Sequence, residues 1–167
     1  MKDTSSKVTK PYTRFYLTML ILSSIGTSAG LANLTSIQAT LALMETSAPY
    51  VACLLISMLT WAISVVALVL LWRKHPLGIQ LKVSAYVVNI LATIGMIITA
   101  APIVDLLTSK VPPELTANSQ LTEAAAANIL EAGFYLSLCF SIIANLAFAL
   151  LWLRAWRGQQ RADTISQ

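Results

Sequence analysis

The residues of this chain that could do chemistry are mostly small or uncharged polar side chains inside long apolar runs. The candidates for helix packing or for lining a pore are Gly26, Gly30, Asn33, Asn89, Thr93 and Asn145. In lipid, small residues let helices approach closely, and amide or hydroxyl groups hydrogen-bond between helices at about 0.6 to 2 kcal/mol each. These residues therefore predict a seam between packed helices, and the alternative is a hydrophilic pathway through the membrane.

A second set of candidates is acidic. Glu45, Asp105 and Glu131 each fall at one end of an apolar run, away from most of the basic residues. A compact bundle would bring the three carboxylates to one outer mouth, where a ring of acids could attract cations. The alternative is that they are ordinary flanking residues on the translocated face.

Side chains suited to covalent or metal chemistry are scarce. The only histidine, His75, stands beside Arg73 and Lys74, so neither a pair of haem ligands nor a catalytic metal site can be assembled. Cys53 and Cys139 do not form a CxxC pair, which argues against a thiol oxidoreductase. Two buried free thiols are expected, with a disulfide between the second and fourth spans as the alternative. The sequence predicts a protein that is not an enzyme and has no cofactor or metal.

Four long uncharged runs must position these residues. The chain is 57% hydrophobic and only 11% charged, whereas soluble domains are about 25% charged. Each run is long enough for the roughly 20 apolar residues that a transmembrane helix needs, and a lone strand could not satisfy its backbone in lipid. We therefore predict an all-α fold, an integral membrane four-helix bundle (tetraspan). The predicted spans lie at about 15–44, 47–72, 82–104 and 130–153.

The remaining segments complete the predicted organisation. The basic N-terminal segment is 1–14, the transmembrane domain 15–157, its outer loop 105–128 and the C-terminal tail 158–167. Prolines make the first half of the outer loop irregular, while Ala124–Ala127 predicts that the fourth helix starts outside the bilayer. The second and fourth spans both end in Leu-Leu-Trp, so an arrangement as two like-oriented helical hairpins is one option.

Basic residues set the predicted orientation. All of them except Lys110 lie on one side of the spans, in residues 2–14, from Arg73 to Lys82, and after residue 153. By the positive-inside rule we predict a multi-pass plasma (inner) membrane protein with both termini in the cytoplasm. This places Lys82 in a loop and leaves no ionisable side chain inside a span. The alternative to four spans is that the first run is a cleaved signal peptide, since small residues follow Ile25.

Two functions fit these features. The leading hypothesis is a non-catalytic subunit or assembly component of a membrane complex, because it requires no chemistry that the chain lacks. The alternative is a small oligomeric channel or facilitator whose pore is lined by the polar face of the first helix. The expected partners are the lipid bilayer and other membrane protein subunits or further copies of this chain. The basic charge indicates lipid contact, and no nucleic acid is expected.

Overall fold

The computed structural model describes residues 12–29, 45–109 and 123–165, and the secondary-structure elements within these ranges are helices. In chain order they are α1 (Arg14–Ala29), α3 (Ala48–Trp72), α4 (Pro76–Ile98), α5 (Ala101–Ser109) and α7 (Glu123–Ile165). Helices α3, α4 and α7 are long and apolar enough to cross a membrane. The chain is therefore an all-helical membrane protein with three candidate spanning helices in its described part. The first predicted span is described only as far as Ala29.

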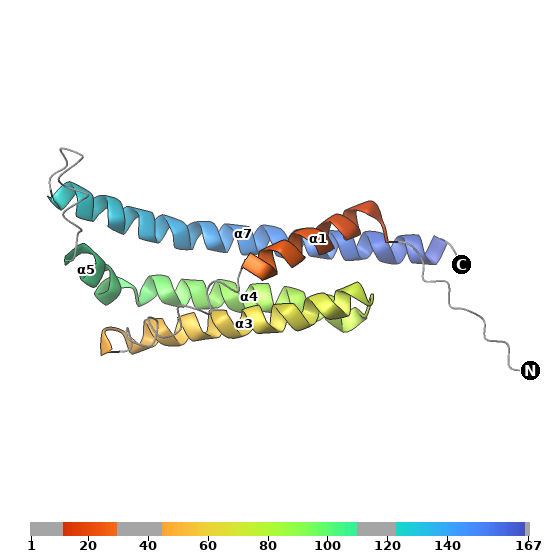
Figure 1. Ribbon diagram of the computed structural model, residues 1–167, viewed down its shortest axis with the longest axis horizontal. Helices are drawn as coiled ribbons and strands as arrows, with labels where there is room; N and C mark the ends of the chain where they lie inside the picture. Colours follow the sequence, from red (N-terminus) through yellow and green to blue (C-terminus); the bar gives the residue numbers. More distant parts are fainter. Residues whose placement is uncertain (1–11, 30–44, 110–122, 166–167) are drawn as a thin grey trace, which may run out of the picture.

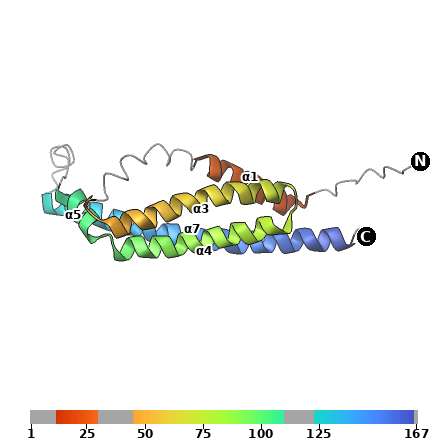
Figure 2. The same ribbon diagram turned by 90° about the horizontal axis from the view of Figure 1, so that it is seen from below.

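The long helices run side by side. Helices α3 and α4 form an antiparallel hairpin, and α7 packs along α4 (Figure 1). Helix α1 contacts α7 and α3 near the end where the α3–α4 turn lies, while α5 contacts α7 at the opposite end. In the turned view, α1 lies on the α3 side of the bundle (Figure 2). The four helices α1, α3, α4 and α7 thus surround a common interior.

The turn between α3 and α4 is short because the residues that follow α3 directly form the N-terminal cap of α4. Lys74 adopts a left-handed conformation, φ 53°, where the chain reverses. The Nδ1 atom of His75 accepts a hydrogen bond from the main-chain N–H of Leu77 at 3.2 Å. Pro76 begins α4, a position at which its missing donor costs nothing. The sequence predicted a loop as far as Lys82, whereas this capping starts the helix at Pro76.

Gly78 lets the first turns of α4 pack against the end of α3. A Cβ built at this position would lie 2.9 Å from the main-chain nitrogen of Leu71 and 3.1 Å from the carbonyl oxygen of Ala67. Both are backbone atoms inside a helix, so they cannot move aside as a flexible side chain could. Close approach at small residues is a usual way for membrane helices to pack.

The third predicted span, 82–104, is divided between two helices. Helix α4 ends at Ile98 and α5 begins at Ala101. Pro102 lies in the first turn of α5, and it cannot donate a hydrogen bond that would continue the preceding helix. Helix α7, in contrast, runs beyond the predicted 130–153 in both directions. Its start at Glu123 agrees with the helix-forming alanines that follow.

The C-terminal part of α7 is held by polar contacts. Gln159 is buried, and its side-chain oxygen accepts a hydrogen bond from the main-chain N–H of Thr13 at 2.7 Å. The Nζ atom of Lys74 lies 3.7 Å from a carboxylate oxygen of Asp163 and 4.8 Å from the centroid of the Tyr12 ring. These contacts join the start of α1, the α3–α4 turn and the last turns of α7. Most of the segment predicted as a C-terminal tail is therefore part of the fold.

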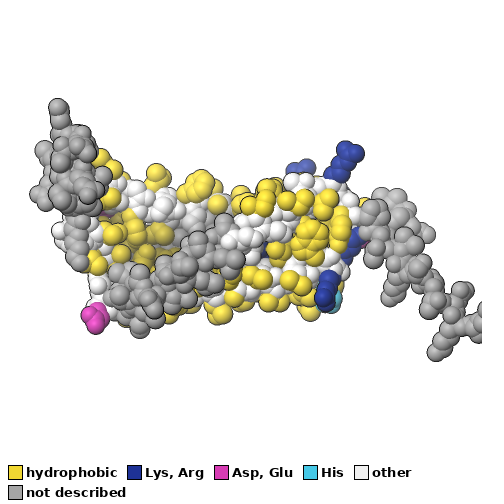
Figure 3. Space-filling model, in the orientation of Figure 1, with side chains coloured by type: hydrophobic (Ala, Val, Ile, Leu, Met, Phe, Trp, Pro, Cys, Tyr) yellow, Lys and Arg dark blue, Asp and Glu magenta, His cyan; other side chains and the backbone are white. Residues whose placement is uncertain are grey.

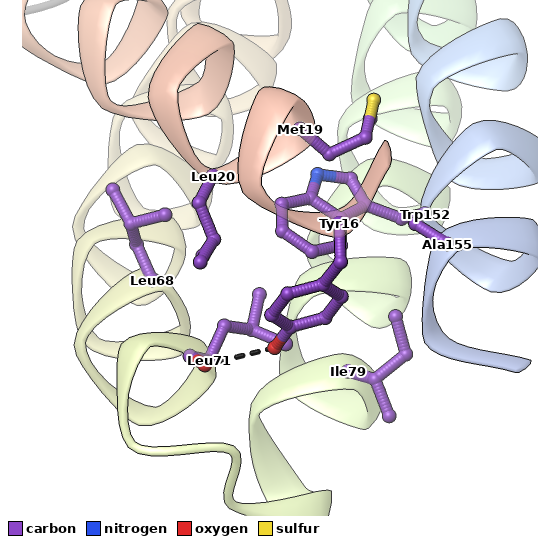
Figure 4. Packing of buried hydrophobic residues seen from close by; sticks show 8 residues of the cluster. All are labelled: Tyr16, Met19, Leu20, Leu68, Leu71, Ile79, Trp152 and Ala155. Atoms are coloured by element: carbon purple, nitrogen blue, oxygen red, sulfur yellow. Dashed lines mark hydrogen bonds between the residues drawn. The ribbon is translucent and has the colours of Figure 1, made fainter. Parts of the chain in front are cut away.

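Two clusters of buried apolar residues hold the bundle. In the first, the Tyr16 hydroxyl donates a hydrogen bond to the carbonyl oxygen of Leu71 at 2.8 Å (Figure 4), and its ring meets that of Trp152 edge to face at 5.7 Å. This Tyr16 cluster consists of Tyr16, Met19, Leu20, Leu68, Leu71, Ile79, Trp152 and Ala155. The Tyr50 cluster, at the α5 end, consists of Tyr50, Met96, Ala100, Ile103 and Val104. The two apolar clusters therefore lie toward opposite ends of the bundle.

Candidate functional site

A half-open cavity of about 500 Å³ lies among the helices of the bundle, and along α3 and α4 it falls between the Tyr16 cluster and the Tyr50 cluster. Helices α1, α3, α4 and α7 all contribute to its wall. The lining residues are Leu22, Ser23, Gly26, Thr27, Leu54, Ser57, Met58, Thr60, Trp61, Ser64, Lys82, Ala85, Tyr86, Asn89, Asn145 and Phe148. The volume falls within the roughly 300–1,000 Å³ typical of small-molecule sites.

Lys82 is the one charged side chain in the described wall of this cavity. It is only 3% exposed, and its Nζ lies 5.3 Å from the centroid of the Tyr86 ring, close enough for the ring face to attract the cation. No carboxylate is among the described lining residues, and the ion pair found within the described ranges involves other side chains. The ammonium group is thus turned toward the bundle interior without an acidic partner there.

The burial of Lys82 corrects the sequence analysis, which placed this residue in a loop and left the spans without ionisable side chains. Because α4 starts at Pro76, Lys82 lies roughly 9 Å along the helix from its first residue, at about 1.5 Å per residue. The sequence did carry a signal. Lys82 stands four residues before Tyr86, so it extends the polar face of Tyr86, Asn89 and Thr93 by one turn.

Hydrogen bonds between helices form part of the cavity wall. The hydroxyl of Ser57 on α3 donates to Oδ1 of Asn89 on α4 at 2.7 Å. The indole N–H of Trp61 on α3 donates to the main-chain carbonyl oxygen of Thr27 on α1 at 3.0 Å. Polar groups of neighbouring helices therefore meet each other, as a packing seam requires, and the same residues border the cavity.

Aromatic side chains close the wall on the side of the Tyr16 cluster. Trp152 is buried, and its indole N–H donates to the hydroxyl of Ser23 at 3.0 Å. Tyr86 approaches the same two side chains, and its ring stacks near that of Phe148, with 6.3 Å between the centroids. Neither Trp61 nor Trp152 was expected from the sequence to line the interior. Hydropathy does not distinguish a tryptophan at the membrane surface from one that donates a hydrogen bond inside a bundle.

The predicted packing residues have different surroundings. Asn89 bonds to the neighbouring helix, as described above, while the buried Thr93 donates to the Asn89 carbonyl oxygen of its own helix at 2.7 Å. Asn145 lines the cavity, and its amide donates to the Ser141 carbonyl oxygen at 2.7 Å. Gly26 lies at the exposed edge of the cavity wall, and a Cβ built there would meet no described atom within 4 Å. Gly30 and Asn33 lie outside the described residues.

The three acids predicted at an outer mouth are all exposed. Glu45 precedes α3, Asp105 lies in α5 and Glu131 in the first part of α7, so all three belong to the end opposite the α3–α4 turn (Figure 1). Within the described ranges, no group of three or more His, Cys, Asp or Glu side chains is arranged to hold a metal ion. Basic side chains gather at the other end of the bundle (Figure 3).

The two cysteines are free thiols, so the alternative of a disulfide between α3 and α7 is not realised. Cys53 is half-buried and Cys139 is exposed, which differs from the expected burial of both. Cys53 packs against α4 at Gly95, where a built Cβ would lie 2.6 Å from its sulfur. Its position is explained by packing between these two helices.

The cavity offers hydroxyl, amide, indole and ammonium groups, and its described lining residues include no carboxylate, imidazole or thiol. Such groups bind a polar or charged solute through hydrogen bonds and electrostatic attraction. No known protein family, curated protein sequence or solved structure matches the chain. The cavity is therefore the feature from which a function can be argued.

Proposed function

We propose that this chain is a non-catalytic membrane protein of the small channel or facilitator class, whose bundle binds a polar solute in the cavity. The observation that carries the proposal is that hydroxyl groups, amides and Lys82 face a cavity of about 500 Å³ between membrane helices. Polar cavities hold water, whereas apolar ones stay dry. Ionisable side chains inside membrane proteins usually face a water-filled space or a binding partner. The partly apolar wall thus still offers several polar groups at a depth where lipid offers none.

The position of α1 supports a path along the first helix. Ser23, Gly26 and Thr27 line the cavity from α1, so the polar face of this helix borders the space in which the solute would bind. Ser23 and Thr27 also accept hydrogen bonds from tryptophans of α7 and α3. These bonds would hold α1 beside the path without filling it.

The proposal includes four spans, with both termini on the cytoplasmic side of the plasma (inner) membrane. It takes α1 as the start of a span that continues through residues 30–44, because the uncharged run extends that far. The gathering of basic side chains at the end of the bundle where α7 finishes supports the orientation (Figure 3).

Thiol labelling from water tests the proposal. In a chain with Cys53→Ala and Cys139→Ser, we would introduce Gly26→Cys, because a side chain at this position meets no atom within 4 Å. A small membrane-impermeant thiol reagent should modify this cysteine in intact vesicles. The matched control is Leu91→Cys, on the exposed face of α4, which should stay unmodified in lipid. Protection of both positions would contradict the proposal, because the cavity would then be closed to water.

A second candidate is the subunit or assembly component, acting by contacts with other membrane proteins. It is favoured by the first half of α7, where Gly133 and Ser137 are exposed among the described residues and a Cβ at Gly133 would meet no atom within 4 Å. Small residues four positions apart are a common helix-packing face. Co-purification in mild detergent tests this candidate, since Gly133→Leu should release a partner that the wild type retains. Purification of the wild type as a lone monomer would contradict it.

A further inference from the structure

We infer that the solute bound in the cavity is an organic anion with a single negative charge and an apolar part, held at its charged end by Lys82. The inference deepens the proposed function and rests on it. It is drawn from the charges, the hydrogen-bond donors and the apolar surface that the cavity wall presents.

The charge of the site favours an anion. Lys82 is 3% exposed and lines the cavity, and the described wall contains no carboxylate to neutralise it. An ammonium group removed from water is stabilised by an opposite charge at close range. One lysine supplies one positive charge, so the matching ligand carries one negative charge.

The hydrogen-bonding groups of the wall also favour an anion. Two oxygens of the wall each take part in a bond between helices, because the Thr27 carbonyl oxygen accepts from Trp61 and the Asn89 side-chain oxygen accepts from Ser57. This arrangement leaves the amide nitrogen of Asn89 as a donor on the face of α4 that also carries Lys82. Together with the Lys82 ammonium group, this donor would stabilise an anion.

The rest of the wall suits an apolar group. Leu22, Leu54, Met58 and Phe148 line the cavity from α1, α3 and α7. A volume of about 500 Å³ is far larger than a bare inorganic anion needs, and binding sites of this size are typically lined by apolar side chains with a few polar groups that fix orientation. An amphipathic monoanion would use both parts of the wall.

The test compares two thiol reagents of opposite charge at the introduced cysteine Gly26→Cys, again without Cys53 and Cys139. One reagent carries a sulfonate and the other a trimethylammonium group. The anionic reagent should react faster, and Lys82→Met should lower the anionic-to-cationic rate ratio by about tenfold, since a nearby unit charge of low exposure changes the two rates in opposite directions. Lys82→Arg should keep the ratio. Arg157→Gln, which removes an exposed charge outside the cavity, should keep it too.

Competition tests the ligand class without changing Lys82. Hexanesulfonate added to the vesicles should slow modification of the cysteine, whereas neutral hexanol and the matching disulfonate should protect it much less. A second arm uses vesicles that contain palmitate, which presents the same amphipathic chemistry from the bilayer. Protection by palmitate alone would assign the ligand to the lipid phase, and protection by hexanesulfonate would assign it to the aqueous phase.

The outcomes separate this inference from the proposed function. If the cysteine is modified but both reagents react alike and no anion protects it, the cavity is wet and the anion inference is wrong. An unchanged rate ratio in Lys82→Met would overturn the role of Lys82. If neither reagent reaches the cysteine, the proposed function itself fails.

Discussion

Ser57 on α3 and Asn89 on α4 are joined by a hydrogen bond of 2.7 Å between their side-chain oxygens, with Ser57 as the donor. Both residues line the cavity. Among the described residues, theirs is the one hydrogen bond between side chains that joins α3 to α4. It shows how a polar face can belong to a packing seam and to a cavity wall at once.

Removal of this bond should weaken the hairpin modestly. We expect Ser57→Ala to lower the free energy of unfolding by about 0.6 to 1.7 kcal/mol, the range for hydrogen bonds between membrane helices. Titration of the purified protein from mild detergent into a denaturing detergent measures the change. Ser84→Ala makes the same chemical change at an exposed position of α4 and should have little effect. Equal losses for the two variants would mean that the bond does not contribute.

Gly78 should tolerate no side chain. Gly78→Ala places a methyl group 2.9 Å from the main-chain nitrogen of Leu71, and overpacking of this kind costs about 1 to 3 kcal/mol. Gly133→Ala is the matched control, because nothing lies within 4 Å of its built Cβ and alanine is favoured over glycine in a helix by about 1 kcal/mol. The same unfolding titration should therefore rank Gly133→Ala at or above the wild type and Gly78→Ala well below it. Equal stability of the two variants would refute the close approach of α4 to α3.

The contact between Gly95 and Cys53 should behave as a coupled pair. Gly95→Ala puts a Cβ 2.6 Å from the Cys53 sulfur. Because this sulfur ends a side chain that can rotate, we expect a smaller loss of stability than for Gly78→Ala. Cys53→Ala removes the sulfur and should make room for the new methyl group. A double-mutant cycle in the unfolding titration should show that Gly95→Ala costs less when Cys53→Ala is present. Additive effects would mean that the two residues do not touch in the membrane.

The proposed orientation predicts where a reporter enzyme works. A reporter that is active only in the cytoplasm should function when fused after Gln167 and fail when inserted near Asn118, because the basic ends are expected to stay inside. The reverse pattern would overturn the orientation. Activity at both sites would overturn the proposed number of spans.

The sequence was sufficient to predict the long apolar helices, because length and lack of charge are local properties. Thus α3 lies within one residue of the predicted 47–72, and α7 includes the predicted 130–153 but extends beyond it at both ends. The start of α4 was missed, since it depends on the capping of Leu77 by His75 rather than on hydropathy. Because the predicted span began at residue 82 and α4 begins at Pro76, the burial of Lys82 inside the bundle was not predicted.

The cavity itself could not be predicted from residue periodicity. The pattern of polar residues shows which face of a helix is polar, but not whether two polar faces touch or stand apart. Ser57 and Asn89 touch, whereas Gly26 has no neighbour within 4 Å of a built Cβ. Asn89 and Gly26 were both predicted as packing or pore candidates, and only the three-dimensional arrangement of α1, α3 and α4 distinguishes them.

Solute flux through vesicles that carry the purified chain tests the central claim most directly. Two solutes are compared, erythritol as an uncharged polyol that crosses lipid slowly and hexanesulfonate as the inferred class of anion. At least one of them should leave vesicles containing the wild type faster than protein-free vesicles. Gly26→Phe, which would fill the cavity from α1, should abolish the difference while the protein remains folded. Leu91→Phe adds the same ring at a position that is 63% exposed and should leave the flux unchanged. Equal efflux of both solutes from wild-type and protein-free vesicles would contradict the assignment of this chain as a facilitator.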